Sequence, residues 1–197
     1  MVQKLNGHSK LFRKKVDILR SAASAFRDRG FAATSMRTIA RQVGLTPGAL
    51  YHYFDSKSDL LFFCQKYSAD RLLEKARRVL GRKMSWREKL RTIIAEQILC
   101  ILDELSGSAA HLEIHALDPG RRPAIVRRRD AYEGLLRRAI ERGIRSGEFA
   151  PCDVRMTAFA VLGAINWTAR WYRPEGAQSA AEIASKFADY LVRGLVR

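Results

Sequence analysis

The stretch that decides the fold is GFAATSMRTIARQVGLTPGALYHYFDSKSDLL, Gly30–Leu61. Its apolar residues recur at three- and four-residue steps, which is the spacing of helices with one buried face. Gly44-Leu45-Thr46 interrupts this pattern, and glycine there permits a tight turn that other residues resist. Thr46-Pro47 then has the order in which helices begin, a capping side chain before a first-turn proline. We therefore predict a helix-turn-helix over residues 35–54.

The second helix of this pair has an unusual set of outward-facing residues. Leu50 and Phe54 are four residues apart and are expected to point inward. Small residues at the start of the helix let its backbone approach base edges, while the tyrosine and histidine side chains that follow can donate hydrogen bonds to phosphates or bases. Hydroxyl and basic side chains flanking the two helices are placed to meet phosphates. The predicted DNA-contacting residues are Thr34, Ser35, Arg37, Pro47, Gly48, Ala49, Tyr51, His52, Tyr53 and Lys57. Taken singly, Tyr51 as a core aromatic and His52 as an ordinary surface residue remain open alternatives.

Five short segments carry a resemblance to a known family. They are Gly30-Phe31, Thr34-Ser35-x-Arg37-x-Ile39-Ala40, Gly44-Leu45-Thr46-x-Gly48, Leu50-Tyr51-x-x-Phe54 and Lys57. In these residues the chain resembles the DNA-binding domain of TetR/AcrR-type repressors. The resemblance implies an all-α, Ω-shaped homodimer, with an N-terminal three-helix DNA-binding domain and a C-terminal helical domain for ligand binding and dimerisation. It also implies that ligand binding spreads the two DNA-reading heads, and it adds Thr46 to the DNA-contacting residues. The family often has histidine where this chain has Tyr53.

The charge balance is compatible with a nucleic-acid partner. The 197 residues include 36 Lys and Arg against 20 Asp and Glu, a net charge of +16, and such a chain attracts phosphate backbones. Residues 1–60 hold 11 basic and 4 acidic side chains, and a second surplus lies in Arg121–Arg145, where nine arginines stand against three acidic residues. A merely solvated basic face is the alternative for most of these arginines. Met1–Lys10 shows no apolar periodicity, so a flexible basic arm is expected there.

Other features of the sequence limit the class of protein to which the chain can belong. Hydrophobic residues make up 47% of the chain, enough for a buried core. Cys64, Cys100 and Cys152 are odd in number and widely spaced, which indicates a reducing compartment without a disulfide framework. No apolar run approaches the roughly 20 residues that span a bilayer, and the N-terminus lacks the apolar region of a secretory signal. A cytoplasmic protein without membrane contact is expected.

The rest of the chain predicts a succession of amphipathic helices. Their expected ranges are Trp86–Leu105, Pro123–Ser146, Val154–Trp171 and Ser179–Val196. Together with the N-terminal helices they give an all-α chain of two domains. Residues 12–72 form the predicted DNA-binding domain, and residues 73–197 form the predicted ligand-binding and dimerisation domain.

One cluster in the C-terminal part is a candidate ligand site. In Trp167-x-x-Arg170-Trp171-Tyr172-Arg173-Pro174, an arginine between tryptophans can stack on them and present its fork to an anion. A dimer seam of aromatic residues, with arginines satisfying helix-end carbonyls, is the equal alternative. Ala158, Gly163 and Ala164 are small enough for such a close helix contact.

This cluster resembles the branch of the family that responds to acyl-CoA thioesters of fatty-acid, aromatic or steroid breakdown. Some members of that branch have another arginine one turn earlier, where this chain has Gly163. Arginines of the basic segment, Arg122 among them, are placed to meet the phosphates of CoA. No cofactor is expected, and the effector is expected to be an acyl-CoA.

His111-x-Glu113-x-His115 offers imidazole and carboxylate groups, but on a helix Glu113 would point away from the two histidines. The better interpretation is two histidines that line an apolar pocket, so no metal site is predicted. The predicted ligand-binding residues are Trp167, Arg170, Trp171, Arg173, His111, His115 and Arg122.

These observations favour a ligand-responsive repressor of palindromic operator DNA. The first alternative is a TetR-type repressor of an efflux or stress operon that responds to a hydrophobic drug-like ligand. An enzyme acting on CoA esters needs a nucleophile or an acid/base pair, and the chain shows no such ordered set, so no enzyme is expected. A non-specific architectural DNA binder is the remaining hypothesis.

Overall fold

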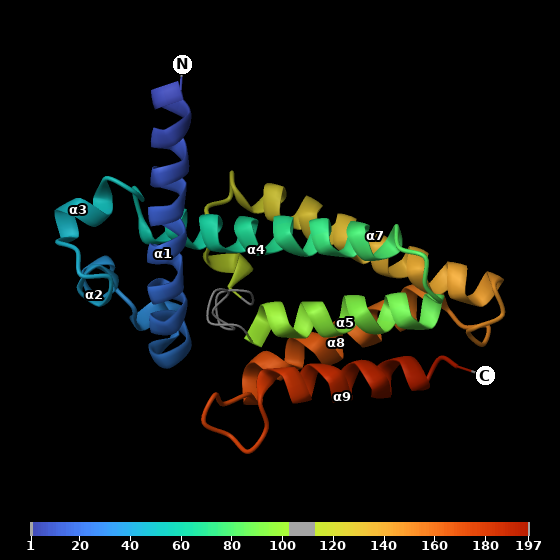
Figure 1. Cartoon of the computed structure of the whole chain (residues 1–197). Coiled ribbons are helices and arrows are strands. Elements are labelled where there is room, and N and C mark those ends of the chain that lie inside the picture. The colour runs from blue at the N-terminus through green and yellow to red at the C-terminus, as the bar shows by residue number, and fades with distance from the viewer. Residues whose placement is uncertain (1, 103–112, 197) are drawn as a thin grey trace. The chain divides into compact units, whose positions relative to one another are not determined.

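The computed structural model describes residues 2–102 and 113–196. These residues form helices and connecting turns, apart from an isolated bridge between Phe149 and Val196 (Figure 1). They divide into two compact units, one of residues 2–65 and 113–122 and the other of residues 66–102 and 123–196. The all-α class predicted from the sequence is confirmed.

The first unit is built on a long helix. α1 spans Val2–Ala33, so the segment expected to be a flexible arm is helical backbone instead. Gly30 has φ of 78°, and this left-handed residue kinks α1 one turn before its end. Gly30 is therefore a bend within α1, followed by a last turn.

Three short elements and the start of a long helix complete the first unit. α2 is Met36–Gln42, α3 is Pro47–Tyr51, the 3-10 turn η1 is Ile114–Ala116, and α4 is Lys57–Leu80. Figure 1 shows α2 and α3 together beside α1. Their core consists of fully buried apolar side chains from all of these helices except η1: Ile18, Leu19, Ala22, Ala25, Phe26, Ile39, Ala40, Leu50, Leu60 and Leu61.

The second unit is a bundle of longer helices. It contains most of α4 together with α5 Trp86–Leu102, α7 Arg122–Arg145, α8 Val154–Trp171 and α9 Ala180–Arg193 (Figure 1). The apolar face of α5 is buried, with Leu90, Ile94 and Ile98 fully enclosed. It packs against apolar residues of the other four helices. This bundle is the C-terminal helical body expected from the sequence.

Short-range caps fix where these helices begin. The Asp153 carboxylate accepts hydrogen bonds from the amides of Arg155 and Met156 at 2.9 and 3.0 Å, which starts α8. Ser179 and Glu182 form a reciprocal capping box at the start of α9. The sequence carries these signals locally, and this is why the predicted and observed starts agree within a residue.

Within the described part of the chain, none of the helices combines the length and the apolar character required to cross a membrane.

Candidate nucleic-acid interface

The turn between α2 and α3 has the geometry expected of a helix-turn-helix. Gly44 has φ of 66°, a left-handed conformation that glycine adopts without strain. The Leu45 amide donates to the Ala40 carbonyl at 2.9 Å and closes the turn. Ser35 caps α2 by accepting from the Thr38 amide at 3.1 Å, and Thr46 caps α3 by accepting from the Ala49 amide at 3.1 Å.

Apolar residues on the inner faces hold the two helices at a fixed angle. Ile39, Ala40 and Leu50 are completely buried, and Phe54 is 1% exposed. The Phe54 ring packs against that of Phe63, with centroids 5.4 Å apart. α3 ends at Tyr51, three residues before the predicted end near Phe54. The Tyr53 and Phe54 amides still donate to the Leu50 carbonyl, so the chain continues as a turn that buries Phe54.

The outer side of α3 and its flanks is open. Tyr51 is 51% exposed, and His52 beside it is exposed as well. Ala49 and Tyr53 are half-buried. The remaining predicted contacts at this surface are all exposed, namely Ser35, Arg37, Thr46, Pro47 and Gly48. The arrangement presents a slim helix tip with polar and aromatic groups behind it, a shape that fits a major groove.

Thr34 lies elsewhere than the sequence suggested. Its side chain is 1% exposed, and its hydroxyl lies 3.1 Å from the Ala25 carbonyl oxygen and 2.8 Å from that of Gly30, to which it donates. The hydroxyl therefore ties the start of α2 to the kinked end of α1. Ser35, not Thr34, provides the exposed hydroxyl at this helix start.

Lys57 is the first residue of α4 and is half-buried. Its ammonium donates to the Phe31 carbonyl at 2.8 Å and to the Ala32 carbonyl at 3.2 Å. It also lies 4.4 Å from the centre of the Phe31 ring. Lys57 thus satisfies carbonyls at the end of α1, a role that sequence spacing could not reveal because the partners are 25 and 26 residues away.

α8 presents an apolar stripe to solvent. Met156 is 60% exposed, Phe159 41% and Trp167 65%, at positions that share one helical face with Gly163. Ala158 and Ile165 face the opposite way and are buried. We call this exposed face, with Trp171 at its end, the α8 stripe. Large apolar side chains gathered on one exposed helical face are typical of a surface that another chain covers.

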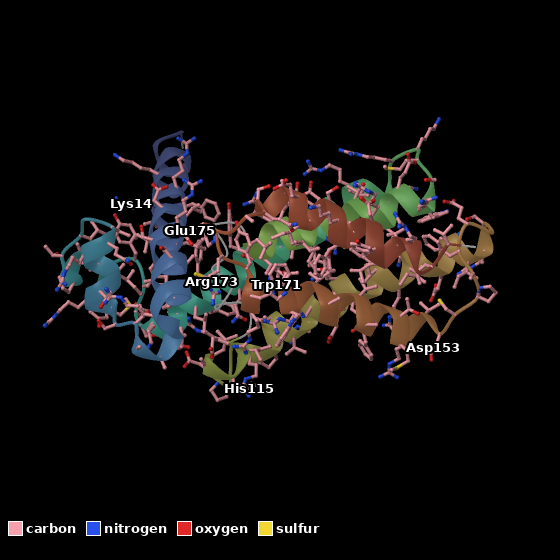
Figure 2. The ribbon with its side chains drawn as sticks, turned by 90° about the horizontal axis from the view of Figure 1, so that it is seen from below. Lys14, His115, Asp153, Trp171, Arg173 and Glu175 are labelled. Atoms are coloured by element: carbon pink, nitrogen blue, oxygen red, sulfur yellow. The ribbon has the colours of Figure 1, made fainter. Side chains whose placement is uncertain are left out.

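The other members of the predicted ligand cluster lie around the end of α8 (Figure 2). Trp171 packs against Phe187 of α9 with ring centroids 5.7 Å apart and remains 40% exposed. Arg170 and Arg173 are exposed, and the Arg173 guanidinium donates to the Tyr172 carbonyl at 3.0 Å. This contact satisfies one backbone carbonyl just after the end of α8.

Two further predicted ligand residues belong to the first unit. His115 is exposed in η1 (Figure 2), and its carbonyl accepts from the Arg122 guanidinium at 3.2 Å. The Nε atom of Arg122 is buried without a hydrogen-bond partner among the described residues. His111 lies outside the described residues. In the part of the chain that the structure describes, no three His, Cys, Asp or Glu side chains come together as a metal site.

Comparison with known proteins decides the family. Residues 18–62 match the family model described as bacterial regulatory proteins of the tetR family, and residues 83–195 match the tetracyclin repressor-like C-terminal domain. The chain belongs to the TetR family. Regulators of this family bind operator DNA as dimers and respond to small-molecule effectors.

Individual TetR-family proteins resemble the chain over almost its full length. The transcriptional repressor KstR2 of Rhodococcus jostii is 28% identical over 92% of this chain and 91% of its own. The crystal structure of PfmR from Thermus thermophilus is 32% identical, with a TM-score of 0.81 over 91% of this chain and 99% of that one. AibR in complex with isovaleryl coenzyme A and operator DNA is 30% identical, with a TM-score of 0.72 over 91% of this chain and 96% of that one. The two family matches make this chain a TetR-family transcriptional regulator.

Proposed function

We propose that this TetR-family protein represses transcription by binding a palindromic operator through the exposed tip of α3, and that an acyl-CoA thioester releases it. The observation that carries the DNA-binding part is the open surface at Tyr51 and His52, above a helix whose inner face is buried. A dimer repeats this surface about a two-fold axis, which is why the operator is expected to be an inverted repeat.

The exposed residues divide by the chemistry they offer. Pro47, Gly48 and Ala49 let the helix approach base edges closely, and Tyr51 and His52 supply donors for base edges. Ser35, Arg37, Thr46 and Tyr53 serve phosphates. The Thr46 oxygen accepts the capping bond, so its hydroxyl hydrogen is available to a phosphate oxygen. Thr34 and Lys57 support this surface from behind. The Lys57 ammonium donates two of its three N–H groups to carbonyls, so the third is available to a phosphate.

The DNA-binding proposal is tested by selecting duplexes from a random pool with the dimer and then measuring binding by fluorescence anisotropy. Selection should return inverted repeats. Tyr51→Ala should weaken binding to the selected duplex about ten-fold or more, with little change on random DNA. Arg37→Ala should weaken binding to both duplexes and lower the salt slope by about 1.

Arg82→Ala is the matched control, because Arg82 is an exposed arginine in the turn after α4. It should bind both duplexes as the unaltered protein does. Equal competition by random DNA would instead favour the architectural binder.

The α8 stripe supports a seam with a second copy of the chain. Gly163 lies in the middle of the stripe with open space around the position of a side chain, so another helix can approach its backbone closely. The large exposed side chains on either side, Phe159 and Trp167, would be covered by the same contact. We therefore propose this face as the dimer seam, with Trp171 and Arg170 at its edge.

The effector part of the proposal rests on chemistry and likeness together. AibR has been solved with isovaleryl coenzyme A, and the arginines of this chain offer forks that suit CoA phosphates. The proposed contacts remain Trp167, Arg170, Trp171, Arg173, His111, His115 and Arg122. The proposed site of action is the cytoplasm, where both the operator and acyl-CoA esters are found.

A thermal-shift screen tests the effector. Acyl-CoA esters of increasing chain length, beginning with isovaleryl-CoA, should raise the Tm and release the selected duplex, whereas free CoA should do neither. Arg170→Ala should retain DNA binding and lose the response. If hydrophobic drugs release the duplex and no acyl-CoA does, the efflux-type repressor is the correct alternative.

A further inference from the structure

A cavity of about 380 Å³ opens in the second unit between helices that the effector proposal did not use. Its lining comes from α4, α5 and the start of α9, namely Arg71, Leu72, Lys75, Glu96, Leu99, Cys100 and Ala180. The volume lies at the lower end of the range for small-molecule sites, roughly 300–1,000 Å³. It therefore suits a small ligand or the acyl part of a larger one.

The charges of this cavity do not balance. Lys75 of α4 and Glu96 of α5 form an ion pair and neutralise each other. The Arg71 guanidinium lies 5.6 Å from the centre of the Tyr67 ring, and no carboxylate among the described residues pairs with it. Two cations and one carboxylate thus line the cavity, which leaves one positive charge in excess.

The remaining lining is apolar. Leu72 is 7% exposed, and Leu99 and Ala180 are half-buried members of the same lining. An apolar wall beside one uncompensated guanidinium is the usual form of a site for a ligand with an apolar body and a charged end. Arginine also keeps its charge at any physiological pH, so the site always prefers an anion.

We propose that this cavity binds an amphipathic ligand that places one anionic group, a carboxylate or a phosphate, against Arg71 and its apolar chain along Leu72, Leu99 and Ala180. It rests on the proposed function only in that such a ligand would be an effector. A bound anion lies close enough to Lys75 to compete with Glu96, so ligand binding weakens the ion pair that joins α4 to α5.

The test is isothermal titration of the full-length dimer with octanoate, octanoyl-CoA and the neutral octanamide. Octanoate supplies a carboxylate and octanoyl-CoA supplies phosphates, so the two arms identify the source of the anion. At least one of them should bind, and octanamide should bind about ten-fold more weakly or not at all. Arg71→Gln should weaken binding of the anionic ligand about ten-fold or more.

Arg78→Gln is the matched control. Arg78 lies on the same helix, pairs with Glu74 and is absent from the cavity lining, so this variant should bind as the unaltered protein does. Ala180→Leu, which fills the cavity from α9 and leaves α4 and α5 unaltered, should abolish binding even if Arg71→Gln proves unstable. Binding that is unchanged in both Arg71→Gln and Ala180→Leu, or equally tight octanamide binding, would overturn the proposal.

Alkylation of a cysteine thiol in the lining reports directly whether the cavity is occupied. Burial raises the pKa of the Cys64 thiol to about 12, so Cys64 does not react with alkylating agents at neutral pH. In a Cys152→Ser background, iodoacetamide then reports on Cys100, and the bound anion should slow its alkylation several-fold. Operator binding by the same samples separates the two proposals. If the dimer binds its operator but no ligand binding depends on Arg71, only the cavity proposal is wrong. If the ligand binds and the operator does not, only the repressor proposal is wrong.

Discussion

At the scale of single residues, the packing of α7 depends on the absence of one methyl group. A Cβ atom on Gly143 would lie 2.1 Å from Cδ2 of Phe149, and the Phe149 ring is completely buried. Glycine is therefore required here by space, since the ring occupies the volume where any other side chain would begin. The same helix contains Gly134, where nothing lies within 4 Å of a Cβ position.

Replacing each of these two glycines by alanine should change the stability of the fold in opposite directions. Gly143→Ala should lower the free energy of unfolding by about 1–3 kcal/mol, because the Phe149 ring has to shift. Gly134→Ala should raise it by up to about 1 kcal/mol through helix propensity. Urea denaturation followed by circular dichroism measures both, and equal effects of the two substitutions would contradict the packing described.

The residue scale is also where sequence reasoning about the site reached its limit. The turn, both caps and the buried positions of Ile39 and Leu50 follow from local spacing, and the structure has them all. Thr34 and Lys57 differ because their hydrogen-bond partners are 9 and 26 residues away. A hydroxyl and an ammonium look equally suited to phosphates until the folded chain places carbonyls beside them.

At the scale of elements, α5 and α9 are joined by a polar clamp as well as by apolar packing, and they lie side by side in Figure 1. The Arg91 guanidinium donates to the Asp189 carboxylate at 2.6 and 3.1 Å and to the Ser185 hydroxyl at 2.8 Å. The hydrogen bond from Arg91 is the main reason that the pKa of Asp189 lies below its usual value. In this clamp one arginine of α5 contacts two residues of α9, a helix that is far from α5 in the sequence.

This clamp predicts a pH dependence of stability. A carboxyl group with a lowered folded-state pKa stabilises the fold above its unfolded pKa of about 4, and that contribution disappears as the pH falls through the folded value. Asp189→Asn should therefore lower the Tm at pH 7, and the difference from the unaltered protein should shrink below about pH 4. A thermal melt series measures this, and in an Arg91→Gln background Asp189→Asn should have little further effect.

Helix ranges were predictable where caps mark them. α8 was expected over Val154–Trp171 and is found there, because Asp153 starts it and Pro174 follows its end. The start of α1 was missed since Met1–Lys10 has no apolar periodicity. The cavity was missed for another reason: Arg71, Lys75 and Glu96 come from two helices, and only tertiary packing brings them to one wall.

At the scale of the whole molecule, the proposed function requires two copies, because the proposed inverted repeat is read by two DNA-binding domains at once. The proposed seam gives this requirement a test. Trp167→Glu introduces a charge into an apolar contact and should raise the dimer dissociation constant about ten-fold or more. Affinity for the inverted repeat should fall with it, since each head then binds separately.

Analytical ultracentrifugation measures the dimer, with Lys83→Glu as the control. Lys83 is exposed in the turn after α4, so the substitution introduces the same side chain away from the seam. A Trp167→Glu protein that stays dimeric and loses only its effector response would contradict the seam and leave Trp167 with a role in the ligand site alone.

The exposure of Trp167 has one more consequence, an optical one. The other two tryptophans have fixed neighbours, Trp86 beneath the Lys89 ammonium at 4.2 Å and Trp171 against Phe187. Trp167 is 65% exposed in the single chain against 40% for Trp171, so the proposed seam predicts that iodide quenches Trp167 more strongly in the single chain and that a second copy protects it. The chain thus carries an unlabelled reporter of its own assembly, and dilution of the native protein is enough to read it.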